Sequence, residues 1–305
     1  METKIKKSIA ASNGNGISKP NAETPSRIDV RKTYKLYIDG KFPRTESGRF
    51  SALKDIQGNI IANICRASRK DLRDAIVSNR KVQNDWAKRS AYNKAQILYR
   101  IAETLEGRKA QFVDVLIQQG YTSAKAKNEV NASIDLLVYY AGWSDKYIQI
   151  FSTVNPVESA HFNFSYPEPT GIVTILAPQA EALLGIISHA APVIIGGNTC
   201  TIVAADKFPL TAIDFAEVLH ASDLPGGVIN ILTGNRKEFI GHASSHMDVN
   251  AIVFSDLSND DKKTVQVNAA LNVKRAIDYS KEPIESPYRI LNCQEIKTTW
   301  HPMGI

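Results

Sequence analysis

The sequence predicts an α/β protein built on a doubly wound, five-stranded parallel sheet. From residue 171 onward, short β-branched runs alternate with stretches of helical periodicity. Strands are expected at 171–176, 199–203, 228–232, 251–254 and 273–277, and helices at 181–195, 209–221, 236–244 and 259–271. Successive βα units form a parallel sheet because each right-handed crossover returns a helix to the face of the sheet.

The first half of the chain has a different pattern. Residues 1–33 contain few large apolar side chains, so they are predicted to form a disordered tail. Two strand-like runs, 34–38 and 49–53, are expected to pair as a ribbon. Helical spacing then begins at Ser68, which suits an N-cap. It continues over 91–106, 109–119 and 123–150.

The composition is that of an ordinary soluble protein, 43% hydrophobic and 22% charged. Polar residues and Pro192 interrupt the richest apolar stretch, 183–195, and the first residues lack the apolar segment of a signal peptide. We therefore expect a cytoplasmic protein with no membrane partner. The net charge is +6, but seven Lys/Arg against three Asp/Glu in residues 1–33 account for +4 of it. Nucleic acid is not an expected partner.

The side chains that most often carry chemistry favour structural roles. Cys65, Cys200 and Cys293 are too far apart in sequence for a zinc site or a disulfide framework, so we expect reduced thiols. His189 lies in an apolar helix and is interpreted as a core residue. His242 and His246 are spaced for one helix face, but no third ligand is evident, so no metal site is predicted. The pair Gly196-Gly197 is typical of a helix end and turn.

Several ordered stretches resemble the aldehyde dehydrogenase superfamily. The first, Tyr139-Tyr-Ala-Gly-Trp-Ser-Asp-Lys146, is similar to the long helix before that family's oligomerisation ribbon. Similar stretches follow in family order: Phe162–Val173, Gly197–Thr199, Pro209–Thr211, Asp223–Gly234 and Ala251–Phe254. The resemblance implies the fold of the aldehyde dehydrogenase nucleotide-binding domain. It divides the chain into N-terminal ribbon and helices (34–152), oligomerisation ribbon (153–170), nucleotide-binding-like core (171–280) and C-terminal oligomerisation strand (281–305).

The resemblance also implies that the family's catalytic domain is missing. Glu295-Ile-Lys-Thr-Thr-Trp300-His-Pro resembles the C-terminal oligomerisation strand, yet it follows the fifth sheet strand by only about twenty residues. No cysteine stands in the family's Gly-Gln-x-Cys setting. The position of the family's oxyanion Asn is occupied by Ala180, which has no donor side chain. Gln179 is shifted by one residue and is interpreted as a solvated loop residue. No catalytic residue is therefore predicted.

The family's cofactor-binding segments are altered as well. Val203-Ala-Ala-Asp206 replaces the Lys-Pro-Ser-Glu segment, and Asp256-Leu-Ser-Asn-Asp-Asp261 replaces a Gly-Ser turn that faces the pyrophosphate. The three acids of the second segment would repel an anionic ligand, although Ser258 and its neighbours also suit a helix start. We expect no NAD binding or only weak binding. The residual cofactor candidates are Pro178, Asp206, Gly234 and Ser255.

Three functions follow. The first is a non-catalytic assembly or regulatory partner, forming homo-oligomers or hetero-oligomers with a complete aldehyde dehydrogenase, because its strand edges favour pairing. The expected interface residues are Phe162, Phe164, Ile296, Thr298 and Trp300. The second is an NAD-linked aldehyde oxidoreductase subunit that shares an active site with a partner chain. The third is a metabolite-binding domain that uses the crevice at the carboxyl ends of the strands.

Overall fold

Five parallel strands form the central sheet, in the order β10-β9-β6-β7-β8. They are β6 (Ile172–Leu176), β7 (Thr199–Val203), β8 (Ile229–Leu232), β9 (Ala251–Phe254) and β10 (Arg275–Asp278). Every residue of β6 to β9 is buried, as expected for a parallel sheet covered on both faces. The computed structural model describes residues 30–304, and the predicted doubly wound sheet is confirmed. Most of the predicted tail, 1–29, lies outside the described residues.

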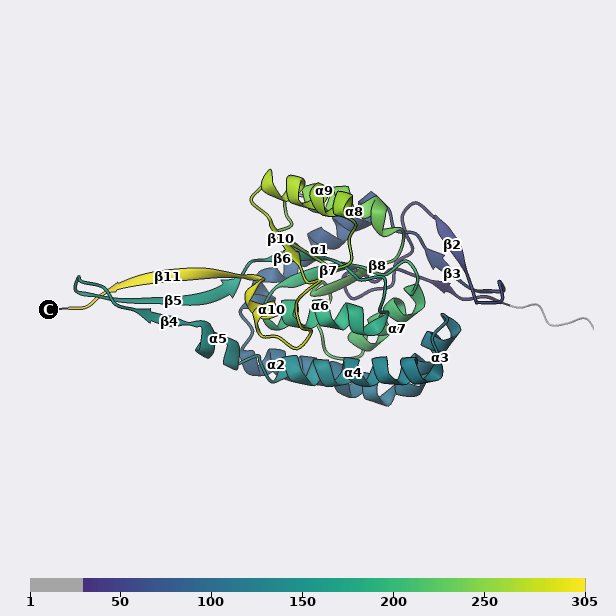
Figure 1. Cartoon of the computed structure of the whole chain (residues 1–305), viewed down its shortest axis with the longest axis horizontal. Helices are drawn as coiled ribbons and strands as arrows, with labels where there is room; N and C mark the ends of the chain where they lie inside the picture. Colours follow the sequence, from purple (N-terminus) through teal and green to yellow (C-terminus); the bar gives the residue numbers. More distant parts are fainter. Residues whose placement is uncertain (1–29, 305) are drawn as a thin grey trace, which may run out of the picture. The chain divides into compact units, whose positions relative to one another are not determined.

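Helices cover both faces of this sheet (Figure 1). One face carries α1 (Arg69–Ala87), α8 (Arg236–Ser245) and α9 (Asn259–Ala270), and the other carries α6 (Leu183–Ile195) and α7 (Pro209–His220). A further layer packs outside α6 and α7, made of α2 (Ala91–Gly107), α3 (Lys109–Gln118) and α4 (Ser123–Ala141). The two main apolar clusters accordingly lie on opposite faces of the sheet.

The helix predicted over 123–150 is wrong in one respect, because the chain breaks it into two. α4 ends at Ala141, and α5 (Lys146–Phe151) begins after a turn. In that turn the Ser144 hydroxyl donates to the carbonyl oxygen of Ala91 at the start of α2, 2.7 Å away. This tertiary hydrogen bond holds the break, and α5 then leads into the next strand.

The ribbon predicted between 34–38 and 49–53 is also wrong. β2 (Phe50–Lys54) pairs antiparallel with an unpredicted strand, β3 (Ile60–Cys65), and β1 (Thr33–Tyr34) pairs parallel with β3. The run 36–38 docks on the main sheet instead, where Tyr37 exchanges backbone hydrogen bonds of 3.0 and 2.8 Å with Ile231. Asp55 closes the β2–β3 turn by accepting the backbone N–H groups of Gln57 and Asn59.

A second antiparallel sheet has the order β11-β5-β4 and extends from the helical body (Figure 1). It contains β4 (Thr153–Asn155), β5 (His161–Pro169) and β11 (Gln294–Pro302). β11 pairs with β5 along its whole length, from Gln294 opposite Pro169 to Pro302 opposite His161. We call the β5–β11 pair the ribbon. Of the segment 281–304, predicted as part of a C-terminal strand, only β11 is a strand, and α10 (Tyr288–Leu291) before it is helical and packs Ile290 against α6.

Two further features of the fold bear on its function. The chain passes from β10 to β11 through residues 279–293, with only α10 between them. Within residues 30–304, no helix is long and apolar enough to cross a membrane.

Candidate functional site

The carboxyl ends of the parallel strands are where open α/β sheets bind ligands. Four neighbouring strands, β9, β6, β7 and β8, end here. Each strand is followed by one polar residue of this site, in a loop or, for Arg236, at the first position of the next helix, and these are Asp256, Gln179, Asp206 and Arg236, in the same order. We call these four residues the loop ring, because their hydrogen bonds form a closed cycle.

The cycle runs through four hydrogen bonds. The backbone N–H of Asp206 donates to Gln179 Oε1 (3.0 Å), and the backbone N–H of Arg236 donates to Asp206 Oδ1 (2.9 Å). Arg236 Nη1 then donates to Asp256 Oδ1 (2.6 Å), and the backbone N–H of Gln179 donates to Asp256 Oδ2 (2.6 Å). The four loops are therefore tied to one another directly, by protein groups alone.

The ion pair in this ring is largely shielded from solvent. The Arg236 side chain is 11% exposed and that of Asp256 is 32% exposed. Arg236 Nη1 also donates to the carbonyl oxygen of Ala177, 2.9 Å away, so the guanidinium spans the ends of two strands. Burial raises the pKa of the Asp206 carboxyl, and the neighbouring Arg236 backbone N–H and charge oppose that rise. Both carboxylates and the guanidinium of the ring are engaged in these contacts, whereas the buried Gln179 Nε2 has no partner among the described residues.

The N-terminus of α6 is occupied in a similar way. Glu129, a buried carboxylate on α4, accepts the backbone N–H groups of Ala182, Leu183 and Leu184 at 2.9, 2.7 and 3.2 Å. Free amides at a helix N-terminus are the usual phosphate-binding element of nucleotide folds. Here a side-chain carboxylate takes the place that an anionic ligand would need.

The four predicted cofactor residues have separate environments. Pro178 packs on α6 so closely that a Cβ at Gly185 would lie 2.6 Å from its Cγ. Ser255 Oγ lies 3.2 Å from Nε2 of the buried His189. Gly234 has a φ of +151° and borders, with Asp206, a hollow of about 340 Å³ beside β2 and β3. Their cofactor role stays a prediction, and among them only Asp206 belongs to the loop ring.

Two interpretations of the loops are wrong. Gln179 is not a solvated residue, because its Oε1 accepts a hydrogen bond and its Nε2 is buried. Asp256 does not present an unopposed negative charge, because Arg236 pairs with it. The helix-start interpretation of the same segment is confirmed: Ser258 is the N-cap of α9 and accepts the backbone N–H of Asp261.

Sequence reasoning missed Arg236 and Glu129. Each is a charged residue at a position in the sequence where a charge is unfavourable. Arg236 is the first residue of its helix, where the helix dipole disfavours a cation. Glu129 falls on the apolar face of α4, next to Val130 and one turn before Ser133. A charge in either position indicates a specific partner.

The cysteines are structural. Cys65, Cys200 and Cys293 are unpaired and buried, and burial raises the pKa of the Cys293 thiol to about 12. Such a thiol is not a nucleophile at neutral pH. Ala180 is exposed, and its carbonyl oxygen accepts a long hydrogen bond from the Tyr121 hydroxyl (3.4 Å).

The histidines fall into two groups. His189 is a core residue, as predicted, and burial lowers its pKa to about 3. His242 lies in the last turn of α8, but His246 lies just beyond its end, so the expected two-histidine helix face does not form. Among residues 30–304, no cluster of three His, Cys, Asp or Glu side chains is placed to hold a metal ion.

The ribbon divides the five predicted interface residues between two faces. Phe162 and Phe164 lie on one face with Tyr166, where successive ring centroids are 5.5 and 6.0 Å apart. A groove of about 310 Å³ follows these rings and Val154. The other face carries Ile296, Thr298 and Trp300. On this face they pair across the strands with Pro167, Ser165 and Asn163, respectively. We call the first the aromatic face. Phe162 is 44% exposed and Trp300 is 57% exposed.

Comparison with known proteins matches most of the chain to one family. The model of the aldehyde dehydrogenase family matches residues 42–277. The putative aldehyde dehydrogenase DhaS of Bacillus subtilis (strain 168) is 29% identical over 251 residues, covering 81% of this chain and 50% of that protein. The cytosolic 10-formyltetrahydrofolate dehydrogenase of Mus musculus is 28% identical over 258 residues, covering 82% of this chain and 28% of that protein.

Solved structures agree on the fold. The NAD+ complex of an aldehyde dehydrogenase from Bacillus cereus superposes with a TM-score of 0.76 at 22% identity, covering 81% of this chain and 50% of that one. The chain thus spans about half the length of the aldehyde dehydrogenases that it matches, and less of the formyltetrahydrofolate enzyme.

Proposed function

Because the chain belongs to the aldehyde dehydrogenase family, we propose that it serves as a non-catalytic assembly partner. It pairs through its ribbon with a second copy or with a complete aldehyde dehydrogenase, and oxidises no aldehyde by itself. One observation carries this proposal: the loop ring ties the loops of the ligand crevice to one another, while the ribbon presents exposed aromatic side chains.

The residues do not supply the chemistry of aldehyde oxidation. That reaction needs a thiolate nucleophile, a donor for the oxyanion and a nicotinamide placed to accept hydride. The cysteines of this chain are buried, and Ala180 offers no side-chain donor. Residues 279–293 join β10 to β11 with only α10 between, where the family resemblance would place a catalytic domain. These features support a silent role.

The cofactor crevice supports the same role. A dinucleotide would have to displace the Arg236–Asp256 pair and compete with Glu129 for the amides of α6. Each of these protein contacts is a charge-assisted hydrogen bond, the stronger class of hydrogen bond in proteins. We therefore expect no NAD binding or only weak binding.

A subunit that shares its active site with a partner chain is the second candidate. The likeness to a fold solved with NAD+ favours it, because a cofactor domain of this kind could serve a thiol from another chain. It requires dinucleotide binding by the assembled complex, which the assembly proposal does not.

The deciding experiment measures mass by light scattering over a concentration series, for the chain alone and mixed with a complete aldehyde dehydrogenase from the same cells. The proposal expects this chain to be part of a dimer or larger species in at least one sample. A monomer under all conditions would contradict it. Dehydrogenase assays on the same samples separate the two candidates, since the shared-site alternative expects new activity in the mixture that neither chain has alone.

A further inference from the structure

A basic cavity lies between α1 and α8, apart from the loop ring and from the ribbon. Its volume is about 510 Å³, within the range of small-molecule clefts. Side chains from the first turns of α1 meet side chains from the last turn of α8 there. The residues that matter are Ser68, Arg69, Lys70, Arg73, His242 and His246.

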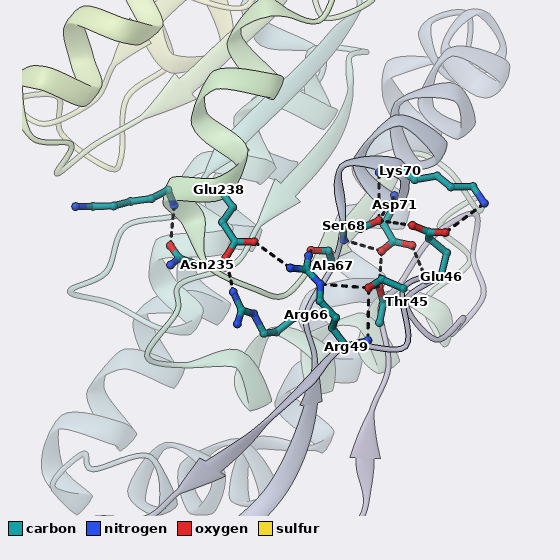
Figure 2. Close-up of polar contacts among 12 residues, drawn as sticks. Thr45, Glu46, Arg49, Arg66, Ala67, Ser68, Lys70, Asp71, Asn235 and Glu238 are labelled. Carbon is teal, nitrogen blue, oxygen red and sulfur yellow. Dashed lines mark hydrogen bonds and ion pairs between the residues drawn. The ribbon is translucent and has the colours of Figure 1, made fainter.

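The charges around this cavity do not balance. Three cations line it against one acid, Glu46. Lys70 Nζ pairs with Glu46 at 3.5 Å, and Arg73 pairs with Asp74 at 3.1 Å (Figure 2 shows Lys70 and Glu46). Arg69 has neither an ion pair nor a hydrogen bond among the residues that the structure describes. One guanidinium is therefore available at the cavity wall.

The backbone of α1 makes this cluster more unusual. Arg69, Lys70 and Arg73 are the first, second and fifth residues of the helix, where the macrodipole disfavours positive charge, and Asp71 and Asp74 lie in the same turns. The helix amides are not free to bind an anion, because the Ser68 hydroxyl accepts the N–H groups of Lys70 and Asp71. Any anion in the cavity would be held by side chains.

The α8 side supplies neutral polar groups. Burial lowers the pKa of His246, and the charges of Lys274 and Arg69 lower it further, against the opposing effect of Asp248. His246 is therefore neutral at pH 7 and offers one ring N–H. His242 lies one turn earlier, at the end of α8.

We propose that this cavity binds a small molecule that carries a phosphate monoester, with Arg69 as the main charged contact. A guanidinium presents two parallel N–H groups to phosphate oxygens, which a single ammonium does not. The lining of this cavity shares no residue with the loop ring.

Isothermal titration of the full chain with glucose 6-phosphate, inorganic phosphate and glucose tests the proposal. Both phosphates are expected to bind with a dissociation constant below about 1 mM, and glucose is not expected to bind. Arg69→Gln should weaken phosphate binding by about tenfold or more. Arg69→Lys should recover only part of it. Arg100→Gln, an exposed arginine on α2 that pairs with Glu103, is the matched control and should bind as the parent does.

Three results would overturn the proposal. The first is the absence of saturable heat with either phosphate. The second is equal weakening of phosphate binding in the Arg69 and Arg100 variants. The third is tighter binding of heparin or RNA that the Arg69 substitution does not change. The last would indicate a general polyanion surface. A thermal unfolding curve for Arg69→Gln that matches the parent excludes loss of fold as the cause of weaker binding, as expected for an exposed side chain.

Discussion

The carboxyl edge of the parallel sheet and the ribbon differ in how far their side chains are paired with other protein groups. At the sheet edge, Arg236, Asp256 and their partners satisfy one another, and Glu129 satisfies the start of α6. On the ribbon, the aromatic face and Trp300 remain open to solvent. A surface that is satisfied internally gains little from a ligand, whereas an exposed apolar surface gains free energy when a partner covers it.

This contrast supports the proposed assembly role. Both regions belong to one family fold, so the fold alone does not distinguish a cofactor site from an assembly surface. The distinction comes from side chains: a guanidinium and carboxylates in the crevice, and rings on the strands.

The largest effect is expected at Glu129. Glu129→Ala leaves three backbone N–H groups at the start of α6 without their acceptor, and should lower the free energy of unfolding by about 3 kcal/mol. Glu129→Gln keeps an acceptor oxygen and should cost about 1 kcal/mol. Urea unfolding measures both. Glu103→Ala, an exposed glutamate on α2, should change stability by less than about 0.5 kcal/mol, and an equal loss there would refute a special role for Glu129.

Arg236→Met should have the next largest effect. It removes the only cation from the loop ring and leaves Asp256 partly buried without its partner. Because Asp256 is about a third exposed, the expected loss is about 2 kcal/mol rather than the larger cost of a fully buried pair. The matched control is Lys237→Met, at the exposed next position. If both variants unfold at the same urea concentration, the ring does not hold the loops together.

On the ribbon, Phe162→Glu should dissociate the assembly without unfolding the chain. A charge on the aromatic face should weaken self-association or hetero-association by about tenfold, or about 1.4 kcal/mol. Trp300→Glu should weaken it less, because the opposite face is centred on hydrogen-bonded polar side chains, Ser165 and Thr298 among them. The control is Tyr92→Glu, which places the same charge at an exposed position on α2. Light scattering that ranks Trp300→Glu above Phe162→Glu would move the interface to the other face.

The last prediction concerns acid stability, where the effect is small for each unit of pH and accumulates as pH falls. His189 has a pKa of about 3 in the folded chain and an ordinary value of 6.5, so it stays neutral when folded while the unfolded chain gains a proton below pH 6.5. The contribution of neutral His189 to the free energy of unfolding is therefore present above pH 6.5. It is lost as pH falls toward 3, by at most about 1.4 kcal/mol per pH unit. His189→Gln should flatten this slope in unfolding curves taken across that range. Exposed His220→Gln should not, and an unchanged slope in both would assign acid loss elsewhere.

Strong periodicity explains why the parallel sheet and its helices were predictable. β6 to β9 are continuous runs of buried residues, and each is followed by a helix with an apolar face. The errors occur where a tertiary contact overrides local pattern. Tyr37 bonds the edge of β8 rather than β2, and Ser144 ends α4 by bonding Ala91. Neither contact has a local sequence signal.

The candidate site was predictable in part. The sequence indicated which family residues are replaced, at Ala180, Asp206 and Asp256. It did not indicate that Asp206 and Asp256 are joined through Arg236, because residues 206, 236 and 256 meet only when four strands align in register. The two faces of the ribbon were hidden for the same reason, since the pairing of β5 with β11 joins segments more than a hundred residues apart.

We infer that the loop ring and Glu129 exclude dinucleotides from the crevice. Isothermal titration of NAD against the purified chain tests it most directly, with Arg236→Met titrated beside the parent. The account predicts no saturable heat for the parent chain at NAD concentrations up to about 1 mM. Micromolar binding by the parent chain would contradict the account and would favour an active site shared with a partner.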